Sequence, residues 1–521
     1  MGFITMDIKG VKMIDKILLR GGGGYWLFVS LYIIAIVYKS SMPLMGGDDM
    51  SIYTQLVQDK SAWHGLAFGN GRFFPLAGWA LTLMAYISID PYALMFINAL
   101  SVFGIALSFY ILAKSLDVPH HYILISFALV ALSVGFVKIM TQITFPETTQ
   151  ILFLMLFLLC AYKLFSTQSL IYAIFGLVCA NACLYLKEVS FIFIGGFGFF
   201  YCAFKIYAKE TLSKKELIFS LLCMLCAVLF LVLYMYFTRE ASSSYAENGV
   251  FSPLRTLVVL LLALPFVSIA LPLMLIYRIY GVLVRKDAIN AFWDSILCIA
   301  ALYVIAYLVL GMASFHYFVP PSVLVCLYGI FFWRTYRERI KKAWITKLSV
   351  AVMGFIWLTS TFPQGLHYYG QNKIQTYSYN EAMDFLADFL KQSPQKTYKI
   401  HFVGFVKGGY NEWMYPHWYS VLPTFYNVRN FEIVDSINGA DILVLSNYAD
   451  IFIDNAFVDS ILASHKVLFA SDNWGYMPYY NLLSLGAWGL QNAGVKHHLS
   501  NKGNIFKLPA QVYVLQTEST Q

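Results

Sequence analysis

The sequence predicts a polytopic α-helical membrane protein with about eleven transmembrane helices and a small extracytoplasmic α/β domain at its C-terminal end. Three observations support this fold class. Of the 521 residues, 59% are hydrophobic and only 12% are charged, too few charges to cover the surface of a soluble protein. Apolar runs of about 20 residues, long enough to cross a bilayer, recur along the first two thirds of the chain. From residue 364 onwards the composition turns polar.

Eleven apolar runs are candidates for membrane spans, and together they define a transmembrane region over residues 1–363. Aromatic residues reach 17%, which suits side chains at membrane–water interfaces. The expected spans are 25–43, 92–113, 121–138, 148–165, 169–186, 190–208, 216–237, 255–277, 292–311, 317–333 and 347–363.

The run 75–88 is apolar but only about 14 residues long, which is short for a span. If it does not cross, most Lys and Arg clusters share one side of the membrane with the N-terminus, as the positive-inside tendency requires. We therefore expect a cytoplasmic N-terminus and an interfacial helix at 75–88, within a first outer loop at 44–91.

The same topology places residues 364–521 outside the membrane. Short apolar stretches at 398–406, 441–445 and 466–470 are typical of strands. Residues 380–391 and 451–463 are typical of helices. Alternation of such elements predicts a small α/β domain.

Adjacent carboxylates, Asp48 and Asp49, follow the first span directly. Neighbouring carboxylates repel each other, so they indicate a bound cation, a general base or a helix N-terminus. The structural alternative is that one of them caps a helix beginning near Met50.

The same loop carries Trp63, His64 and Arg72. Arg72 ends a Gly-Asn-Gly-Arg stretch, and an arginine flanked by glycines suits a fork that binds phosphate. Its alternative interpretation is an interfacial arginine whose head group reaches water.

The second outer loop contains Thr144 and Glu147, whose spacing fits a capping box before a long helix. Glu147 also lies on the membrane face that carries the two aspartates, so three carboxylates could converge there.

Two further junctions on this face carry charge. Lys187 and Glu188 stand between two apolar runs with almost no loop, where charges usually face a cavity or a partner; local pairing is the alternative. His316 and Tyr317 begin a late span, either as site residues or as part of an aromatic belt.

Each of these signals is weak alone, but they recur at successive outer ends of helices. An ion or proton pathway would place ionisable residues in the middle of spans. Carboxylates for a base or a metal, together with cations for phosphate, instead indicate group transfer from a lipid phosphate at the outer surface.

This pattern resembles the GT-C superfamily of membrane glycosyltransferases, which use polyprenyl-phosphate-linked sugars. The likeness extends over about residues 1–335 and is strongest for bacterial glucosyltransferases that decorate surface polysaccharide. One departure is His316, where many relatives have arginine before the late tyrosine. The motifs that carry the resemblance are Asp48-Asp49, Gly71-Arg72, Glu147, Lys187-Glu188 and His316-Tyr317-x-x-Pro320.

The resemblance implies an inverting transfer. Asp48 or Asp49 would be the general base and Glu147 would orient the acceptor. No cofactor is certain, but a divalent cation, Mg or Mn, is a possibility with Asp48, Asp49 and Glu147 as its ligands. The donor phosphate would be bound by Arg72, Lys187, His316 and Tyr317, with Glu188, His64 and Trp63 as further substrate contacts.

The implied partners are the lipid bilayer, a polyprenyl-phosphate sugar and a surface glycan or glycolipid, as in O-antigen modification of lipopolysaccharide, and no nucleic acid is implied. The implied location is the bacterial inner membrane, with a periplasmic C-terminal domain. Two alternatives stay open: an O-antigen polymerase or ligase, and a transporter or flippase of a lipid-linked saccharide.

Overall fold

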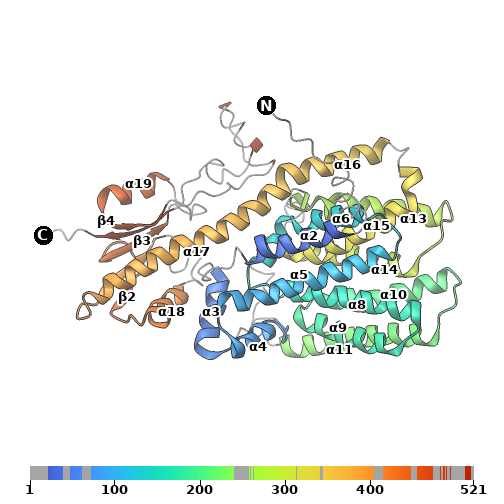
Figure 1. Ribbon diagram of the computed structural model, residues 1–521, viewed down its shortest axis with the longest axis horizontal. Coiled ribbons are helices and arrows are strands. Elements are labelled where there is room, and N and C mark those ends of the chain that lie inside the picture. The colour runs from blue at the N-terminus through green and yellow to red at the C-terminus, as the bar shows by residue number, and fades with distance from the viewer. Residues whose placement is uncertain are drawn as a thin grey trace, which may run out of the picture.

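The computed structural model describes most of the chain. Its described residues are 22–38, 47–61, 72–239, 257–340 apart from 259, 262 and 313, 344–403, 415–446, 455–472, a few positions between 482 and 494, and 511–517. A bundle of long helices forms one part and a β-sheet with its own helices forms the other (Figure 1).

The bundle begins with short elements and continues with long ones. The helices are α2 (Gly23–Tyr32, continued by a π-helical turn, Ile33–Tyr38), α3 (Gly47–Asp59), α4 (Trp79–Ile87), α5 (Pro91–Lys114), α6 (His120–Ala131), α7 (Val134–Met140), α8 (Glu147–Thr167), α9 (Leu170–Leu186), α10 (Ser190–Tyr207), α11 (Lys214–Thr238), α13 (Leu271–Leu283, preceded by the π-helical turn Phe266–Ala270), α14 (Ala291–Val309), α15 (Val319–Ile340, preceded by the 3-10 turn Phe315–Phe318), α16 (Trp344–Ile356) and α17 (Phe362–Lys391).

Local sequence sets several of these ends. Asp90 accepts a hydrogen bond from the Tyr92 amide and Pro91 takes the first helical position, so α5 begins there. Ser213 and Glu216 form a reciprocal capping box at the start of α11.

All eleven expected spans coincide with helices in the described residues, but their count as spans is not confirmed. Among the described residues, seven helices are long and apolar enough to cross a membrane, or eight if a bent pair forms one span. That bent pair is α6 and α7, which meet at 73°, so the expected span 121–138 is broken.

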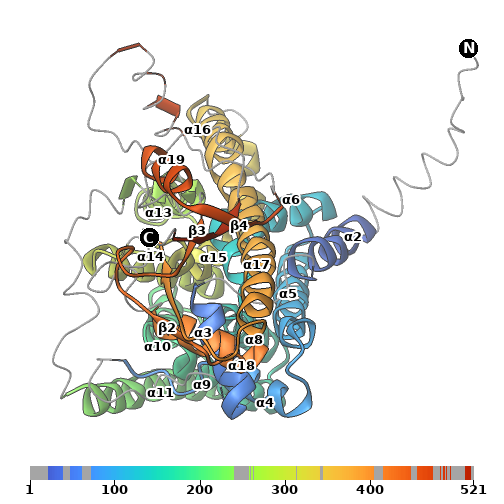
Figure 2. The same ribbon diagram turned by 90° about the vertical axis from the view of Figure 1, so that its left-hand side faces the viewer.

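The last expected span, 347–363, differs in its end. Helix α16 continues through a π-helical turn, Trp357–Thr361, into α17, so the helix passes the expected boundary at 363 and reaches Lys391. The expected helix 380–391 is therefore the end of α17. An uninterrupted helix joins the bundle to the sheet (Figures 1 and 2).

The run 75–88 forms α4, which has nine residues. At 1.5 Å per residue such a helix spans only about 14 Å and cannot cross a bilayer. This agrees with the expectation that the run does not cross.

The C-terminal region contains a five-stranded mixed sheet with strand order β2-β1-β3-β5-β4. Strands β1 and β3 are parallel, and β5 is antiparallel to both β3 and β4. Three of these strands coincide with the expected strands, whereas β2 and β5 were not expected. The elements are β1 (Tyr398–Phe402), α18 (Tyr415–Tyr426), β2 (Phe431–Ile433), β3 (Ile442–Ser446), α19 (Asn455–Ser464), β4 (Lys466–Ala470) and β5 (Val512–Gln516).

Alternating side chains of the sheet fill two cores. Ile442 and Val444 pack with α17 and α18 on one face, and Leu443 and Leu445 pack with α19 on the other. We refer to the sheet with α18, α19 and the end of α17 as the C-terminal unit.

Candidate active site

Charged side chains gather at the end of the bundle that lies nearest the C-terminal unit. Four segments meet there: the start of α3, the turn between α7 and α8, the turn between α9 and α10, and the 3-10 turn before α15.

The turn between α9 and α10 directs two consecutive side chains to different partners. Helix α9 ends because Lys187 takes an extended backbone conformation, with φ −156° and ψ 130°. The Lys187 Nζ then lies 2.8 Å from Glu147 Oε1. The Arg72 Nε donates a hydrogen bond of 2.5 Å to Glu188 Oε1. The alternative of local pairing between Lys187 and Glu188 is therefore wrong.

The inner ion pair, Lys187 with Glu147, is almost completely buried: Lys187 exposes 5% of its surface and Glu147 exposes 1%. Among the described residues, the Lys187 ammonium is the one group near enough to donate to the Glu147 carboxylate, and its charge compensates the burial of that carboxylate. Most buried polar atoms in proteins are hydrogen-bonded, and exceptions often mark functional sites.

The outer pair, Arg72 with Glu188, is more accessible, with side chains 20% and 16% exposed. Burial acts to lower the pKa of Arg72, but the charge of Glu188 and the hydrogen bond to it outweigh this and raise the pKa above its ordinary value. The guanidinium also lies over the Phe74 ring, 4.4 Å from its centroid. Arg72 therefore stays cationic and is held by both contacts.

Tyr317 and His316 complete this cluster. The Lys187 Nζ lies 4.9 Å from the centroid of the Tyr317 ring, which stacks on Tyr307 at 4.9 Å. The His316 Nδ1 lies 2.7 Å from the Ser314 hydroxyl. Both residues pack inside the protein, which does not fit the alternative of an aromatic belt.

Asp49 contacts the turn between α7 and α8. Its Oδ1 accepts hydrogen bonds from the Thr144 amide at 2.9 Å and the Thr144 hydroxyl at 2.6 Å, and its Oδ2 accepts one from the Ile143 amide at 3.3 Å. Helix α3 already begins at Gly47, so Asp49 lies within its first turn and does not cap a helix near Met50.

This contact also removes the expected capping box of Thr144 and Glu147. Helix α8 begins after Pro146 without a side-chain cap, because the Thr144 hydroxyl donates to Asp49 instead. These three hydrogen bonds take up most of the acceptor positions of the Asp49 carboxylate. Asp49 thus joins the first outer loop to the segment that carries Glu147.

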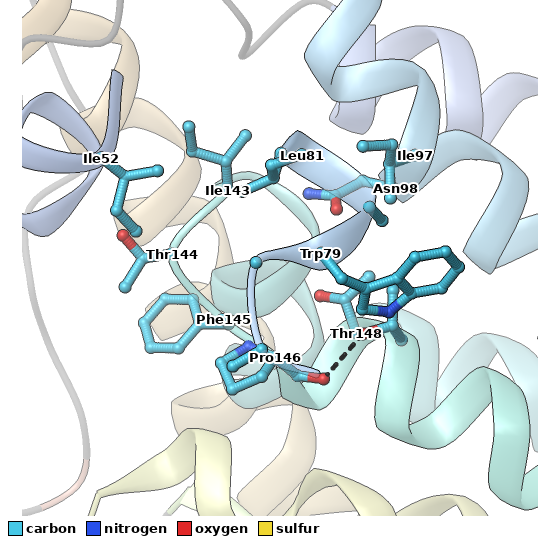
Figure 3. Close-up of a pocket in the computed structure, with 14 residues that line it drawn as sticks. Ile52, Trp79, Leu81, Ile97, Asn98, Ile143, Thr144, Phe145, Pro146 and Thr148 are labelled. Atoms are coloured by element: carbon cyan, nitrogen blue, oxygen red, sulfur yellow. Dashed lines mark hydrogen bonds between the residues drawn. The ribbon is translucent and has the colours of Figure 1, made fainter. Parts of the chain in front are cut away.

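A small pocket lies beside this turn, between α3, α4, α5 and the start of α8 (Figure 3). Ile52, Trp79, Asn98 and Phe145 are among the side chains that line it. Its volume of ≈ 40 Å³ is well below the roughly 150 Å³ of a cavity that binds benzene. The pocket is therefore too small for a sugar ring.

Three predicted site residues are not assessed by the structure. Trp63 and His64 lie outside the described residues, and the side chain of Asp48 is not described, although its backbone belongs to α3. Within the described part of the chain, no three His, Cys, Asp or Glu side chains lie close enough to hold a metal ion. The expected ligand set of Asp48, Asp49 and Glu147 thus gains no support there.

Lys138 is a cation of this site that sequence reasoning did not single out. Its Nζ lies 5.3 Å from the Phe145 ring and 5.4 Å from the Tyr368 ring of α17. Phe145 in turn contacts the His316 ring at 4.7 Å. The available signal was a lysine that ends an apolar run just before the Thr144–Glu147 motif.

No protein-family model and no curated protein matches the sequence. Solved structures do match. The Archaeoglobus fulgidus oligosaccharyltransferase in its apo form is 13% identical over 88% of this chain and 74% of that chain, with a TM-score of 0.47. ArnT from Cupriavidus metallidurans bound to undecaprenyl phosphate is 10% identical over 96% and 98%, with a TM-score of 0.46.

Both matched proteins are membrane glycosyltransferases of the GT-C superfamily, which is the family that the sequence motifs resemble. With TM-scores below 0.5, these similarities do not decide what this chain does. Its function has to be argued from its own site.

Proposed function

We propose that the protein is a membrane glycosyltransferase that moves a hexose, with inversion, from a polyprenyl-phosphate donor to a hydroxyl group of a surface glycan or glycolipid. The observation that carries the proposal is the pair of interlocked ion pairs, Arg72 with Glu188 and Lys187 with Glu147, at one end of an apolar bundle. Cations at this depth can hold a lipid phosphate while its chain stays among the helices.

The leaving group of this reaction is a phosphate monoester. As the acceptor oxygen bonds to the anomeric carbon, the bond from that carbon to the phosphate oxygen breaks, and the electron pair leaves with the phosphate. Arg72 is suited to stabilise the charge that develops there, because a guanidinium binds phosphate with two parallel hydrogen bonds. Lys187 and Lys138 add positive charge nearby.

The acceptor hydroxyl must lose its proton to a base. Asp49 already accepts three hydrogen bonds from residues 143 and 144, which suits it to hold the loop in place. We assign the base to Asp48, its neighbour in the first turn of α3. Glu147, whose carboxylate has the Lys187 ammonium as its one donor among the described residues, would accept a further hydrogen bond from an acceptor hydroxyl.

In the structure each cation is already paired with a carboxylate, so a donor phosphate has to compete with Glu188 for Arg72. The greater exposure of this outer pair makes it the one that opens, while the buried Lys187–Glu147 pair stays closed. Glu188 is then a counter-ion that the donor displaces.

The proposal places this site outside the cytoplasmic membrane of a bacterium, with the N-terminus in the cytoplasm and the C-terminal unit in the periplasm. The lysine and arginine clusters near Arg285 and Arg337 would then face the cytoplasm. In this topology the acceptor approaches from the side of the C-terminal unit.

The test is a transfer assay with the purified full-length chain in lipid nanodiscs. Radiolabelled polyprenyl-phosphate hexoses are supplied with glycolipid extracted from a host strain that lacks the gene. We expect the wild type to transfer label to the glycolipid and Asp48→Asn to transfer none. Transfer by Asp48→Asn at the wild-type rate would overturn the base assignment, and no transfer from any hexose donor would overturn the proposed function.

A further inference from the structure

Helix α3 presents two different faces to the rest of the molecule. Asp49, Ile52 and Leu56 follow one another at helical spacing and face the bundle: Asp49 contacts Thr144, Ile52 lines the pocket beside Thr144, and Leu56 is completely buried in the bundle core.

The adjoining face of α3 packs on the C-terminal unit. Met50 is 2% exposed and belongs to the core beneath the sheet. The Tyr53 ring stacks on Phe425 of α18, with centroids 5.5 Å apart and planes 8° apart. One turn further, Gln58 Nε2 donates a hydrogen bond of 2.7 Å to the Thr424 hydroxyl. Figure 1 shows α3 beside α18, between the sheet and the helical bundle.

We infer that α18 positions the aspartates at the start of α3, so that the stacking of Tyr53 on Phe425 sets the geometry of the base. Tyr53 and Phe425 are positioning residues: they touch neither phosphate nor sugar. The inference rests on the proposed function for its kinetic consequence, but the contact itself joins the C-terminal unit to Asp48 and Asp49 whatever the reaction is.

This arrangement predicts that loosening α3 affects kcat and the KM for the donor differently. In the proposed function the donor phosphate is held by Arg72 and Lys187, whose ion pairs are made with residues outside α3 and α18. The base depends on α3, and a displacement of about 1 Å in a reacting group can lower a rate about 100-fold. Loosening the stack should therefore lower kcat and leave the KM for the donor unchanged.

The test compares Phe425→Ala with three other variants of the full-length protein. Phe425→Tyr keeps a stacking ring. Tyr53→Ala breaks the same stack from α3, so the test survives if one variant does not fold. Phe457→Ala makes the same truncation on α19, on the other side of the sheet, at a phenylalanine that is 40% exposed.

We expect Phe425→Ala and Tyr53→Ala to lower kcat by about 10- to 100-fold at unchanged donor KM. Phe425→Tyr and Phe457→Ala should behave as the wild type. Amide hydrogen exchange across residues 47–59 should accelerate in the two stack variants only.

An unchanged kcat, an equal loss in Phe457→Ala, or unchanged exchange at 47–59 would overturn the inference. If the wild type transfers no sugar, the proposed function fails and the exchange measurement alone decides whether α18 holds α3.

Discussion

The two ends of the helical bundle each bury a cation beside a carboxylate, yet the pairs differ in how completely they are hydrogen-bonded. At the α13–α14 end, Arg278 Nε and Nη2 donate to Asp294 at 2.8 and 2.7 Å. Tyr336, Tyr328, the Ala288 carbonyl and the Asn290 amide take up the remaining hydrogen bonds of the pair. At the site end, the Lys187 ammonium is the one donor to the Glu147 carboxylate in the described part of the chain.

This difference separates a structural ion pair from one that is prepared for a ligand. A buried pair whose hydrogen bonds are complete holds three helices together and has no capacity left to bind anything. A buried carboxylate with a single ammonium donor keeps unused acceptor positions, which cost free energy that a substrate hydroxyl would recover by donating to them. The comparison thus assigns stability to one end and chemistry to the other.

The largest expected effect is on stability, from Arg278→Met. Removing one partner leaves the buried carboxylate of Asp294 uncompensated, which costs about 3–5 kcal/mol. We expect a large fall in melting temperature in detergent. Arg337→Met, at a side chain that is 61% exposed, is the matched control and should melt as the wild type does. Equal melting of the two variants would contradict a structural role for the Arg278 pair.

The next largest effect is on transfer, from Arg72→Ala. Losing the preorganised cation at the leaving phosphate should lower kcat by about 100- to 1000-fold, while the partly exposed position keeps the loss of stability small. Arg72→Lys keeps the charge but not the two parallel hydrogen bonds of a guanidinium, so its kcat should lie between those of the wild type and Arg72→Ala. Steady-state transfer kinetics measure this, and wild-type kinetics in Arg72→Ala would remove Arg72 from the phosphate site.

Replacing both residues of each buried ion pair should change stability by an intermediate amount. Lys187→Met with Glu147→Leu should change stability little, because apolar residues of similar volume can replace a buried ion pair. Arg278→Met with Asp294→Leu should cost more, because each buried partner left without its hydrogen bond costs about 1–3 kcal/mol. Melting temperatures of the two double variants measure this. A larger loss of stability in the Lys187/Glu147 variant than in the Arg278/Asp294 variant would contradict a structural role for the Arg278 pair.

The smallest effect is expected on donor affinity, from Glu188→Gln. The variant removes the carboxylate that competes with phosphate for Arg72, and partly exposed ion pairs are worth about 0.2–1 kcal/mol. Undecaprenyl phosphate should therefore bind about 1.4- to 5-fold more tightly. Glu210→Gln, which breaks the exposed Lys205 pair, is the control. Weaker binding in Glu188→Gln would show that Glu188 assists the donor and does not compete with it.

The sequence predicted the helices well because apolar runs report burial in lipid or protein directly. It did not predict the 73° bend between α6 and α7 or the continuous helix from α16 into α17. The bend brings Gly135 against Phe315, where a Cβ atom would lie 2.8 Å from the Phe315 carbonyl oxygen. Such a close approach is a tertiary contact, and hydropathy carries no information about it.

The gathering of charged residues at one end could be predicted, because each of them stands at a helix end on the same side. Their pairing could not. Arg72 and Glu188 are 116 positions apart, and Asp49 and Thr144 are 95 apart. Local patterns instead offered capping by Asp48 or Asp49, a capping box of Thr144 with Glu147, and, as an alternative, a local Lys187–Glu188 pair, since spacing along the chain describes only neighbours.

The most direct test of the account is photo-crosslinking with an undecaprenyl-phosphate analogue that carries its reactive group beside the phosphate, in the wild type in nanodiscs. The account predicts crosslinked peptides that contain Arg72, Lys138 and residues 187–188, and their loss when excess undecaprenyl phosphate is added. Crosslinks concentrated around Arg278 and Asp294, or a pattern that excess lipid does not displace, would contradict a donor site at this end of the bundle.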